Sequence, residues 1–532
     1  MQITGRQLIA GSEAAASSDS FKAANPATGK ALKPAFYEAT VADVDQAVQA
    51  AVEAFDPFRR KLVESRADFL DAIADETLAL GDEFLERTSA ETGYPLARCS
   101  AERDRAINHT RQFANLIREG SWLDARIDPP DPTRKPIPKP DVRSLMQPLG
   151  PVAVFGASNF PIAISVLGAD TMSAFASGCP VVVKGHPAHP GTCELAARAI
   201  YAAAEKTRMP AGVFSLLQGR SHEVGIKLVE HPDITAAAFT GSLGGGRALF
   251  DIANQRPVPI PFYAEMGSVN PLFILPGALK ARASEIAEGF VAALTQGNGQ
   301  FCTNPGLVLG NESEAWQNFS ELVKEKVEAV VPSTMLHAGI HKAYRSGIKL
   351  RGENKALQIL AQSSQGPDDD KLEAAAYLFS TTQQGISNDP TLLDELFGPS
   401  STLVTCGGVD DMIALAKSLE GNLSVTIHGT EEDLANHKEL ISVLQKKTGR
   451  LIFNGYPVGL EVCHSIHHGG PYPATTHSHY TSVGTRAIQR FVRPLCYQDW
   501  PDSLLPMELQ NANPRGVLRL LNGERTRDPV RV

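Results

Sequence analysis

The chain has no closely spaced pair of cysteines, and this absence excludes a disulfide framework. Its 7 cysteines are spread over 532 residues, and no two of them form a C-x-x-C pair. Disulfide-stabilised exported domains carry a dense and even set of cysteines, and structural zinc sites commonly use paired ones. The sparse, odd count therefore indicates a reducing compartment, and we expect a cytoplasmic protein.

A strong charge of one sign is also missing. The 50 Lys and Arg residues against 59 Asp and Glu residues give a net charge of −9, which is small for this length. Nucleic acids and anionic membranes bind strongly basic surfaces, so the charge argues against either partner. The N-terminus, MQITGRQLIAG, has no apolar core long enough for a signal peptide, and we expect no export.

One weakly charged stretch is long enough to cross a bilayer, but its pattern argues against a membrane helix. Between Leu149 and Val183 the only charged residue is Asp170. Prolines interrupt the stretch, and it divides into strand, loop, helix and strand. A buried unit of a parallel sheet accounts for it better.

The chain has the composition of an ordinary globular protein, with 43% hydrophobic and 20% charged residues. At 532 residues it is too long to fold around one hydrophobic core. Helical periodicity dominates from about Val41 to Glu119. Residues 127–141 are rich in proline and predict an extended excursion or a pair of edge strands. A second alternating region covers about 270 to 455, and the tail from 476 to 532 carries no motif of its own.

Strands and helices alternate from 150 to 265, which predicts a doubly wound parallel sheet. Such sheets bind ligands beyond the carboxyl ends of their strands. The expected strands cover 151–158, 180–185, 213–218, 234–240 and 259–265.

The segment GNGQFCTNPG at 297–306 is the most informative stretch of the chain. It places Cys302 in a glycine-rich turn just after an apolar helical segment. Small and polar neighbours leave the sulfur approachable and the backbone N–H free. This pattern favours covalent attack on a carbonyl, with the N–H stabilising the oxyanion, over a cysteine that serves only packing.

Three further elements contain residues suited to the same chemistry. Asn159, in the turn FGASNFP, could donate to a developing oxyanion, and Glu265 lies where the strand ends in YAEMGSVNP (263–271). An apolar setting would raise the pKa of that carboxyl and make it a general base near neutrality. Gly241 and Ser242 lie between a strand and a helix N-terminus, which favours binding of a phosphate. The dinucleotide fingerprint GxGxxG is absent.

Together these segments resemble the aldehyde dehydrogenase superfamily. The resemblance covers nearly the whole chain, through NPATG (25–29), SNFP (158–161), VVVKGHPA (181–188), FTGS (239–242), EMGS (265–268), GQFC (299–302), ELFGP (395–399) and FNGYP (453–457). EMGS stands where the family usually has ELGG, and GQFC where it has GQxC, so both key residues are kept.

The resemblance implies an α/β fold with a Rossmann-like dinucleotide-binding domain (1–126 and 146–266), an α/β catalytic domain (267–475), and a small β oligomerisation flap with the C-terminal tail (127–145 and 476–532). It implies a homodimer or homotetramer. Cys302 would be the nucleophile, Asn159 with the Cys302 N–H the oxyanion hole, and Glu265 the base that hydrolyses the thioester. Because a free thiol is only a few per cent ionised at neutral pH, Cys302 needs activation, for which the helix end and bound cofactor are candidates.

The resemblance also implies a nicotinamide dinucleotide cofactor. Lys184 would bind the adenosine ribose, Ser242 the pyrophosphate and Glu395 the nicotinamide ribose, with Phe397 packed near the nicotinamide. Family members that prefer NAD usually have a glutamate three residues after the lysine, where this chain has Pro187. Without that carboxylate, and with positive charge from His186, His189 or Arg220, we expect NADP to be preferred and NAD to remain possible.

The expected substrate follows from two resemblances. Residues 467–506 resemble the branch that oxidises α-ketoglutaric semialdehyde (2,5-dioxopentanoate). The N-terminal half resembles that branch and also a neighbouring one that acts on longer aliphatic aldehydes. A substrate carboxylate needs a cationic or N–H-rich anchor, and the spacing does not choose among the candidates Arg450, His464, His468 and Arg486.

Other readings explain less of the chain. Five histidines at 464–479 suggest a metal site, but without HExxH or companion carboxylates we expect none. A cysteine hydrolase that pairs Cys302 with one of these histidines would leave the phosphate-type turn unexplained. A catalytically silent relative would have lost Cys302 or Glu265. Glu265 also argues against a CoA-acylating dehydrogenase.

Overall fold

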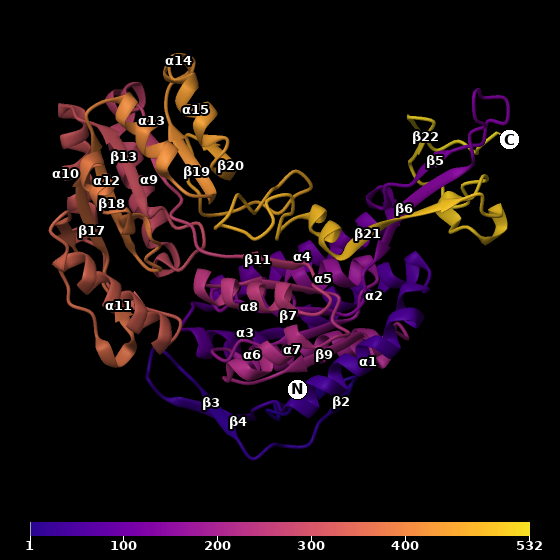
Figure 1. The fold of residues 1–532 in the computed structure, drawn as a ribbon. Helices are drawn as coiled ribbons and strands as arrows, with labels where there is room; N and C mark the ends of the chain where they lie inside the picture. The colour runs from indigo at the N-terminus through magenta and orange to yellow at the C-terminus, as the bar shows by residue number, and fades with distance from the viewer. Residues whose placement is uncertain (1, 532) are drawn as a thin grey trace.

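The first half of the chain is built around a seven-stranded sheet in the computed structural model, which describes residues 2–531 (Figure 1). From edge to edge, its strands are β11 (Phe262–Glu265), β10 (Ala236–Thr240), β7 (Val152–Phe155), β8 (Val181–Lys184), β9 (Phe214–Leu217), β1 (Leu8–Ile9) and β2 (Ser12–Glu13). β11 through β9 are parallel, which confirms the predicted doubly wound sheet. β11 begins at Phe262 and not at residue 259, because Pro261 has no N–H for the ladder.

Helices cover both faces of this sheet. They are α1 (Val41–Arg59), α2 (Val63–Ala79), α3 (Gly81–Thr92), α4 (Leu96–Glu119), α5 (Ala169–Ser177), α6 (Pro190–Lys206), α7 (His222–Glu230) and α8 (Leu243–Gln255). Val181 and Val183 of β8 pack in the core with α2, α4, α5 and α6, whereas Val182 packs in the core with α1, α7 and α8. Strands buried on both faces account for the near absence of charge between 149 and 183.

A second seven-stranded sheet organises the later part of the chain. Its strands, in order, are β15 (Gln358–Gln362), β17 (Tyr377–Thr382), β18 (Ser400–Cys406), β13 (Leu307–Asn311), β12 (Leu272–Ile274), β19 (Asn422–His428) and β20 (Thr448–Phe453). All neighbours are parallel except β15 and β17. The helices are α9 (Pro276–Thr295), α10 (Glu314–Glu328), α11 (Ala338–Glu353), α12 (Gln383–Asn388), α13 (Val409–Ser418), α14 (Glu431–Asn436) and α15 (Lys438–Leu444).

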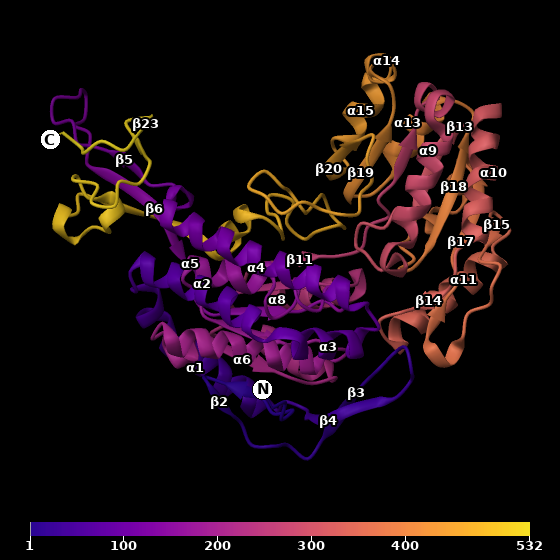
Figure 2. The same ribbon diagram turned by 180° about the vertical axis from the view of Figure 1, so that it is seen from behind.

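A five-stranded sheet forms an arm that projects from the first body (Figure 2). Its order is β21 (Val492–Gln498), β6 (Val142–Pro148), β5 (Arg126–Asp128), β22 (Arg519–Leu521) and β23 (Glu524–Thr526). Of the two expectations for 127–141, the extended excursion agrees with the segment between β5 and β6, which contains no helix or strand. The alternative of a pair of edge strands is wrong, because the C-terminal tail adds strands outside β5 and β6. The prolines lie mostly in the tip between those two strands, where they remove no ladder donor.

The two large sheets direct different edges towards the segments that contain Glu265, Cys302 and Glu395. β7, β8, β10 and β11 end at the carboxyl edge of the first sheet, and residues 266–271 lead directly from β11 to the start of β12. Cys302 and Glu395 precede β13 and β18, so they lie at the amino edge of the second sheet. The loop after β20 runs between the two bodies (Figure 1), and its Thr475 pairs with Glu265 in an isolated bridge.

None of the helices in residues 2–531 is long and apolar enough to cross a membrane.

Candidate active site

Cys302 is held by a turn that only glycine-rich sequence can form. Gly297, Asn298 and Gly299 all have positive φ values, between 55° and 65°. A Cβ on Gly299 would lie 2.3 Å from the carbonyl carbon of Gly398, so the turn packs directly on the chain that carries Glu395. The side-chain amide of Asn270 donates to the Cys302 carbonyl at 2.9 Å. The backbone of the cysteine is therefore fixed while its side chain stays partly accessible.

Asn159 is 6% exposed and lies against the same turn. Its Nδ2 donates to the Gln300 carbonyl at 3.2 Å, two residues before Cys302. Its own carbonyl accepts from the Tyr94 hydroxyl at 3.3 Å and from the Arg98 guanidinium at 3.1 Å. The amide has a second N–H, which suits the predicted oxyanion donor.

Glu265 is buried and held by two residues from the loop after β20. His468 Nε2 lies 3.0 Å from its Oε1, and the Ser482 hydroxyl donates to its Oε2. Burial by itself raises the pKa of Glu265, but the neighbouring charge of His468 and the hydrogen bonds from His468 and Ser482 lower it overall. The expectation of a raised pKa for Glu265 is therefore wrong, because the sequence did not place these partners beside it.

The Cys302 thiol is not ionised by its own surroundings. Burial, followed by the charge of Glu265, raises its pKa well above the usual value, and Arg105 lowers it only in part. His468 Nε2 lies 3.5 Å from Sγ, between the thiol and Glu265. Cys302, His468 and Glu265 thus form one contact cluster, of which the sequence predicted two members with catalytic roles.

A cavity of about 770 Å³ runs from this cluster along the carboxyl edge of the first sheet. Of the residues predicted for catalysis or cofactor binding, it is lined by Asn159, His186, Gly241, Ser242, Glu265, Cys302, Glu395 and Phe397. Ser242 caps α8, and its Oγ accepts from the Gly245 N–H at 3.3 Å. The exposed N-terminus of α8 therefore presents backbone N–H groups to the cavity, which fits the pyrophosphate of a dinucleotide.

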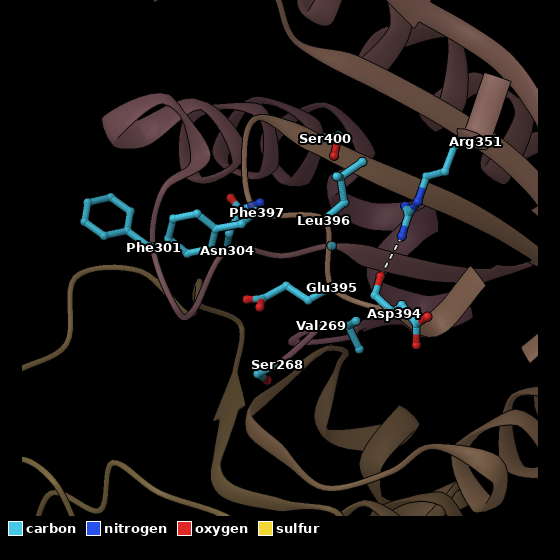
Figure 3. Close-up of a pocket in the computed structure, with 11 residues that line it drawn as sticks. Ser268, Val269, Phe301, Asn304, Arg351, Asp394, Glu395, Leu396, Phe397 and Ser400 are labelled. Atoms are coloured by element: carbon cyan, nitrogen blue, oxygen red, sulfur yellow. Dashed lines mark hydrogen bonds between the residues drawn. The ribbon is translucent and has the colours of Figure 1, made fainter. Parts of the chain in front are cut away.

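Glu395 and Phe397 also line this cavity. They line a smaller neighbouring pocket as well, which Figure 3 draws with the Glu395 carboxylate close to Ser268. A Cβ on Gly267 would lie 2.7 Å from Glu395 Oε2, so a side chain at 267 would displace the carboxylate from its present position. Burial raises the pKa of Glu395 to about 7, although the Ser268 backbone N–H opposes the rise. A carboxylate at this place can accept hydrogen bonds from ribose hydroxyls.

The residues predicted to bind the adenosine end of the cofactor do not all lie beside the cavity. Lys184 ends β8, its ammonium donates to the Gly219 carbonyl, and burial lowers its pKa to about 8. Half-buried Pro187 follows two residues after Gly185. Arg220 does not line the cavity: its guanidinium lies over the Phe21 ring, 3.9 Å from Glu38.

The positive charge expected near the cofactor is not supported at His186 but is supported at His189. Burial alone would lower the pKa of His189, but the charge of Cys193 and the hydrogen bond to it raise that pKa to about 9. Burial and the neighbouring His189, His337 and Lys184 hold the pKa of His186 well below its usual value, so the ring is neutral. His189 is fully buried, with Nε2 3.0 Å from the Ala157 carbonyl and Nδ1 3.3 Å from Cys193 Sγ. It does not line the cavity.

A second cavity, of about 820 Å³, reaches the same turn and contains Arg105 of α4. It is also lined by Phe160 and Phe301, which adjoin Asn159 and Cys302 in the sequence. The Arg105 guanidinium lies 5.4 Å from the Phe160 ring centroid and has no salt bridge within residues 2–531. Burial lowers its pKa, and the charges of Glu102, Cys302 and Glu265 oppose that shift. An arginine here remains cationic.

The other predicted anchors for a substrate carboxylate are distributed. The Arg450 guanidinium donates to the Pro457 carbonyl, and its pKa is lowered by burial and raised by the charge of Cys302. His464 Nδ1 contacts the Thr485 hydroxyl at 3.0 Å, and Arg486 is exposed. Arg105 and Ser482 were not predicted, because α4 gave only a helical pattern and the tail showed no motif.

Across residues 2–531, one set of three metal-binding side-chain types gathers closely, and it is the cluster of Glu265, Cys302 and His468. These groups already contact one another as nucleophile, carboxylate and imidazole, so we assign them no metal. The remaining histidines of 464–479 do not gather into such a set in the part of the chain that the structure describes.

The arrangement fits a cysteine-dependent enzyme that acts on a carbonyl beside a cavity whose lining suits a dinucleotide. A model of the aldehyde dehydrogenase family matches residues 13–472. The chain is 47% identical to α-ketoglutaric semialdehyde dehydrogenase 2 of Azospirillum brasilense over 98% of this chain and 100% of that protein. It is 44% identical to α-ketoglutaric semialdehyde dehydrogenase of Acinetobacter baylyi, over 98% and 99% of the two chains.

Solved structures agree on the fold. Betaine aldehyde dehydrogenase of Staphylococcus aureus in complex with NAD⁺ superposes with a TM-score of 0.79 at 19% identity, over 93% of this chain and 97% of that one. The protein therefore belongs to the aldehyde dehydrogenase family, as the sequence segments predicted, and it is an oxidoreductase of the NAD(P)-dependent class.

Proposed function

We propose that the protein oxidises α-ketoglutaric semialdehyde to 2-oxoglutarate. Two near full-length relatives carry that name. The observation in the structure that carries the proposal is Arg105, a half-buried cation without a salt bridge, in a cavity that shares the turn of Cys302. An unpaired arginine in a concave site suits a carboxylate at the far end of a short aldehyde. A long aliphatic aldehyde would leave this charge without a partner.

The residues of the site have separate roles in the proposed reaction. The Cys302 sulfur adds to the aldehyde carbon, and the Asn159 amide with the Cys302 N–H stabilises the oxyanion. A bound nicotinamide dinucleotide supplies the hydride acceptor. Glu265 then removes a proton from the water that hydrolyses the thioester on Cys302. Ser242 and the α8 N-terminus would hold the pyrophosphate, and Lys184 and Glu395 the two riboses.

We expect carboxylate-bearing aldehydes to be favoured through Arg105. In a panel of purified aldehydes, kcat/KM for 2,5-dioxopentanoate should exceed that for hexanal. Arg105→Met should reduce the former by about 10- to 100-fold, because a hydrogen bond to a charged group is worth about 1.5–3 kcal/mol, and should leave the latter nearly unchanged. Arg103→Met, on an adjoining part of α4, is the matched control. Hexanal as the better substrate would instead support the aliphatic-aldehyde alternative.

The cofactor preference is a separate proposal, supported by Pro187 and Lys184. No carboxylate at 187 repels a 2′-phosphate, and the Lys184 ammonium lies at the end of β8. We expect a higher kcat/KM with NADP⁺ than with NAD⁺. Pro187→Glu should shift the ratio towards NAD⁺ by about tenfold or more, since like charges placed close together repel. A wild-type preference of tenfold or more for NAD⁺ would refute the proposal.

We also propose a cytoplasmic homodimer or homotetramer that assembles through the arm. The five-stranded sheet, which combines residues 126–148 with the tail after 492, supports this proposal. Its outer strands, β21 and β23, have unpaired edges within residues 2–531, and such edges can pair with another chain. We also propose the three expected domains: a dinucleotide-binding domain (1–126 and 146–266), a catalytic domain (267–475), and the oligomerisation flap with the C-terminal tail (127–145 and 476–532).

A further inference from the structure

Arg98, near the start of α4, is half-buried among three aromatic rings and has no ion pair within residues 2–531. Its guanidinium carbon lies 3.6 Å from the Tyr94 ring centroid, 4.8 Å from that of Phe301 and 5.5 Å from that of Phe160. A half-buried charge without a carboxylate partner is costly for packing alone. Arginine suits such a place because its planar face can stack while its N–H groups donate.

The Arg98 guanidinium contacts both segments that carry the oxyanion donors. Its Nη2 donates to the Asn159 carbonyl at 3.1 Å. On the other side it stacks near Phe301, the residue before Cys302. Its Nη1 lies so close to Gly297 that a Cβ there would collide with it. The guanidinium therefore lies between the loop of Asn159 and the turn of Cys302.

The same face of α4 also holds the continuation of the Asn159 loop. Residues 156–168 join β7 to α5 and form no helix or strand, so their position depends on contacts with other elements. Glu102 Oε1 accepts from the N–H groups of Ile162 at 2.8 Å and Ala163 at 2.9 Å. Glu102 lies one helical turn after Arg98. The helix thus anchors this loop at two places, and Arg98 couples it to the neighbouring turn.

We propose that Arg98 is a positioning residue that sets the distance between the Asn159 amide and the Cys302 N–H. The proposal rests on the assignment of these two groups as the oxyanion donors. Such donors act only when both lie about 2.7–3.1 Å from the developing charge, and a misplacement of about 1 Å can reduce the rate by about 100-fold. The hydrogen bond to the Asn159 carbonyl and the stacking near Phe301 oppose separation of the two segments.

A second role for Arg98 has to be distinguished from this one, because Arg98 and Arg105 line the same cavity of about 820 Å³. Arg98 already lies among three rings and donates to a carbonyl, whereas Arg105 lies over the Phe160 ring alone among the rings of residues 2–531. The substrate carboxylate is therefore assigned to Arg105. A positioning residue affects every aldehyde equally, whereas a carboxylate anchor affects only aldehydes that carry one.

The test is the single-turnover rate of hydride transfer at saturating aldehyde, measured in parallel with 2,5-dioxopentanoate and hexanal. In Arg98→Met this rate should fall by about 10- to 100-fold for both aldehydes. The half-saturating concentration of each aldehyde should stay within about twofold, and the dinucleotide Kd should not change. Arg111→Met is the matched control, since it removes an exposed arginine of α4 that pairs with Asp75, and it should match the wild type.

A double-mutant cycle shows whether the effect passes through Asn159. Asn159→Ala alone should lower the rate by about 10²- to 10³-fold. Addition of Arg98→Met should then lower it by less than about threefold, because the donor that Arg98 positions is already gone. Full, independent losses from the two changes would overturn the proposal. A loss confined to 2,5-dioxopentanoate, or a wild-type rate in folded Arg98→Met, would overturn it too.

Retained dinucleotide binding shows that each variant is folded. Arg98→Lys keeps the charge and a donor but not the planar face, and it replaces Arg98→Met if that variant does not fold, with a smaller loss of the same pattern expected. The proposed substrate is tested in the wild type by the ratio of kcat/KM for the two aldehydes. Either proposal can therefore fail while the other stands.

Discussion

Replacement of Cys302 by alanine is expected to reduce aldehyde oxidation by about 10⁴-fold or more while dinucleotide binding is retained. Every later step of the proposed reaction takes place on the carbon that this sulfur holds, so its loss removes the covalent route as a whole. The binding groups for the cofactor, Ser242, Lys184 and Glu395, belong to other segments. Production of reduced cofactor, read by absorbance, measures the first effect, and fluorescence titration measures the second.

Cys463→Ala is the matched control for this variant. Cys463 is the other half-buried cysteine of the chain, and it lies in the loop that also carries His468. Its replacement should leave kcat/KM within about twofold, as expected for a side chain outside the reacting cluster. Undiminished oxidation by Cys302→Ala would show that another group holds the substrate.

The second large effect is expected at Glu265. Glu265→Gln keeps the shape of the side chain but removes the base that activates water, so thioester hydrolysis should slow by about 10²- to 10³-fold. Hydride transfer should still occur once, which gives a burst of about one reduced cofactor per site in a stopped-flow experiment. Because the pKa of Glu265 is lowered, the carboxylate is ionised throughout the neutral range, and the wild-type hydrolysis step should fail only as the solution becomes acidic.

Glu325→Gln removes an exposed carboxylate on α10, a helix that contributes no residue to the site, and should show no burst. A slow first turnover in Glu265→Gln, with no burst, would mean that Glu265 serves the attack and not the hydrolysis.

Local sequence was enough to predict the residues that strand ends and turns position. Glu265 ends β11, and Gly241 follows β10. Cys302 follows a turn whose glycines indicate positive φ values, which Gly297 and Gly299 have. Each of these is decided within about ten residues of the chain. The parallel sheet was predicted for the same reason, from strands that are apolar on both faces.

The partners of these residues could not be predicted, since they come from distant parts of the chain. His468 is 166 residues from Cys302 and 203 from Glu265, and Ser482 is 217 from Glu265. Nothing in the pattern around 467–484 fixes how that loop crosses between the two sheets. The error in the direction of the Glu265 pKa follows directly, because burial alone acts in the opposite sense to these contacts.

The central claim is that the substrate becomes bound to the sulfur of Cys302, and it can be measured in a single quenched turnover. Glu265→Gln is mixed with 2,5-dioxopentanoate and NADP⁺, stopped with acid within the burst, and digested. We predict an added acyl group on the peptide that carries Cys302, in an amount equal to the reduced cofactor formed. Reduced cofactor formed with that peptide unmodified, or with the acyl group on another residue, would contradict it.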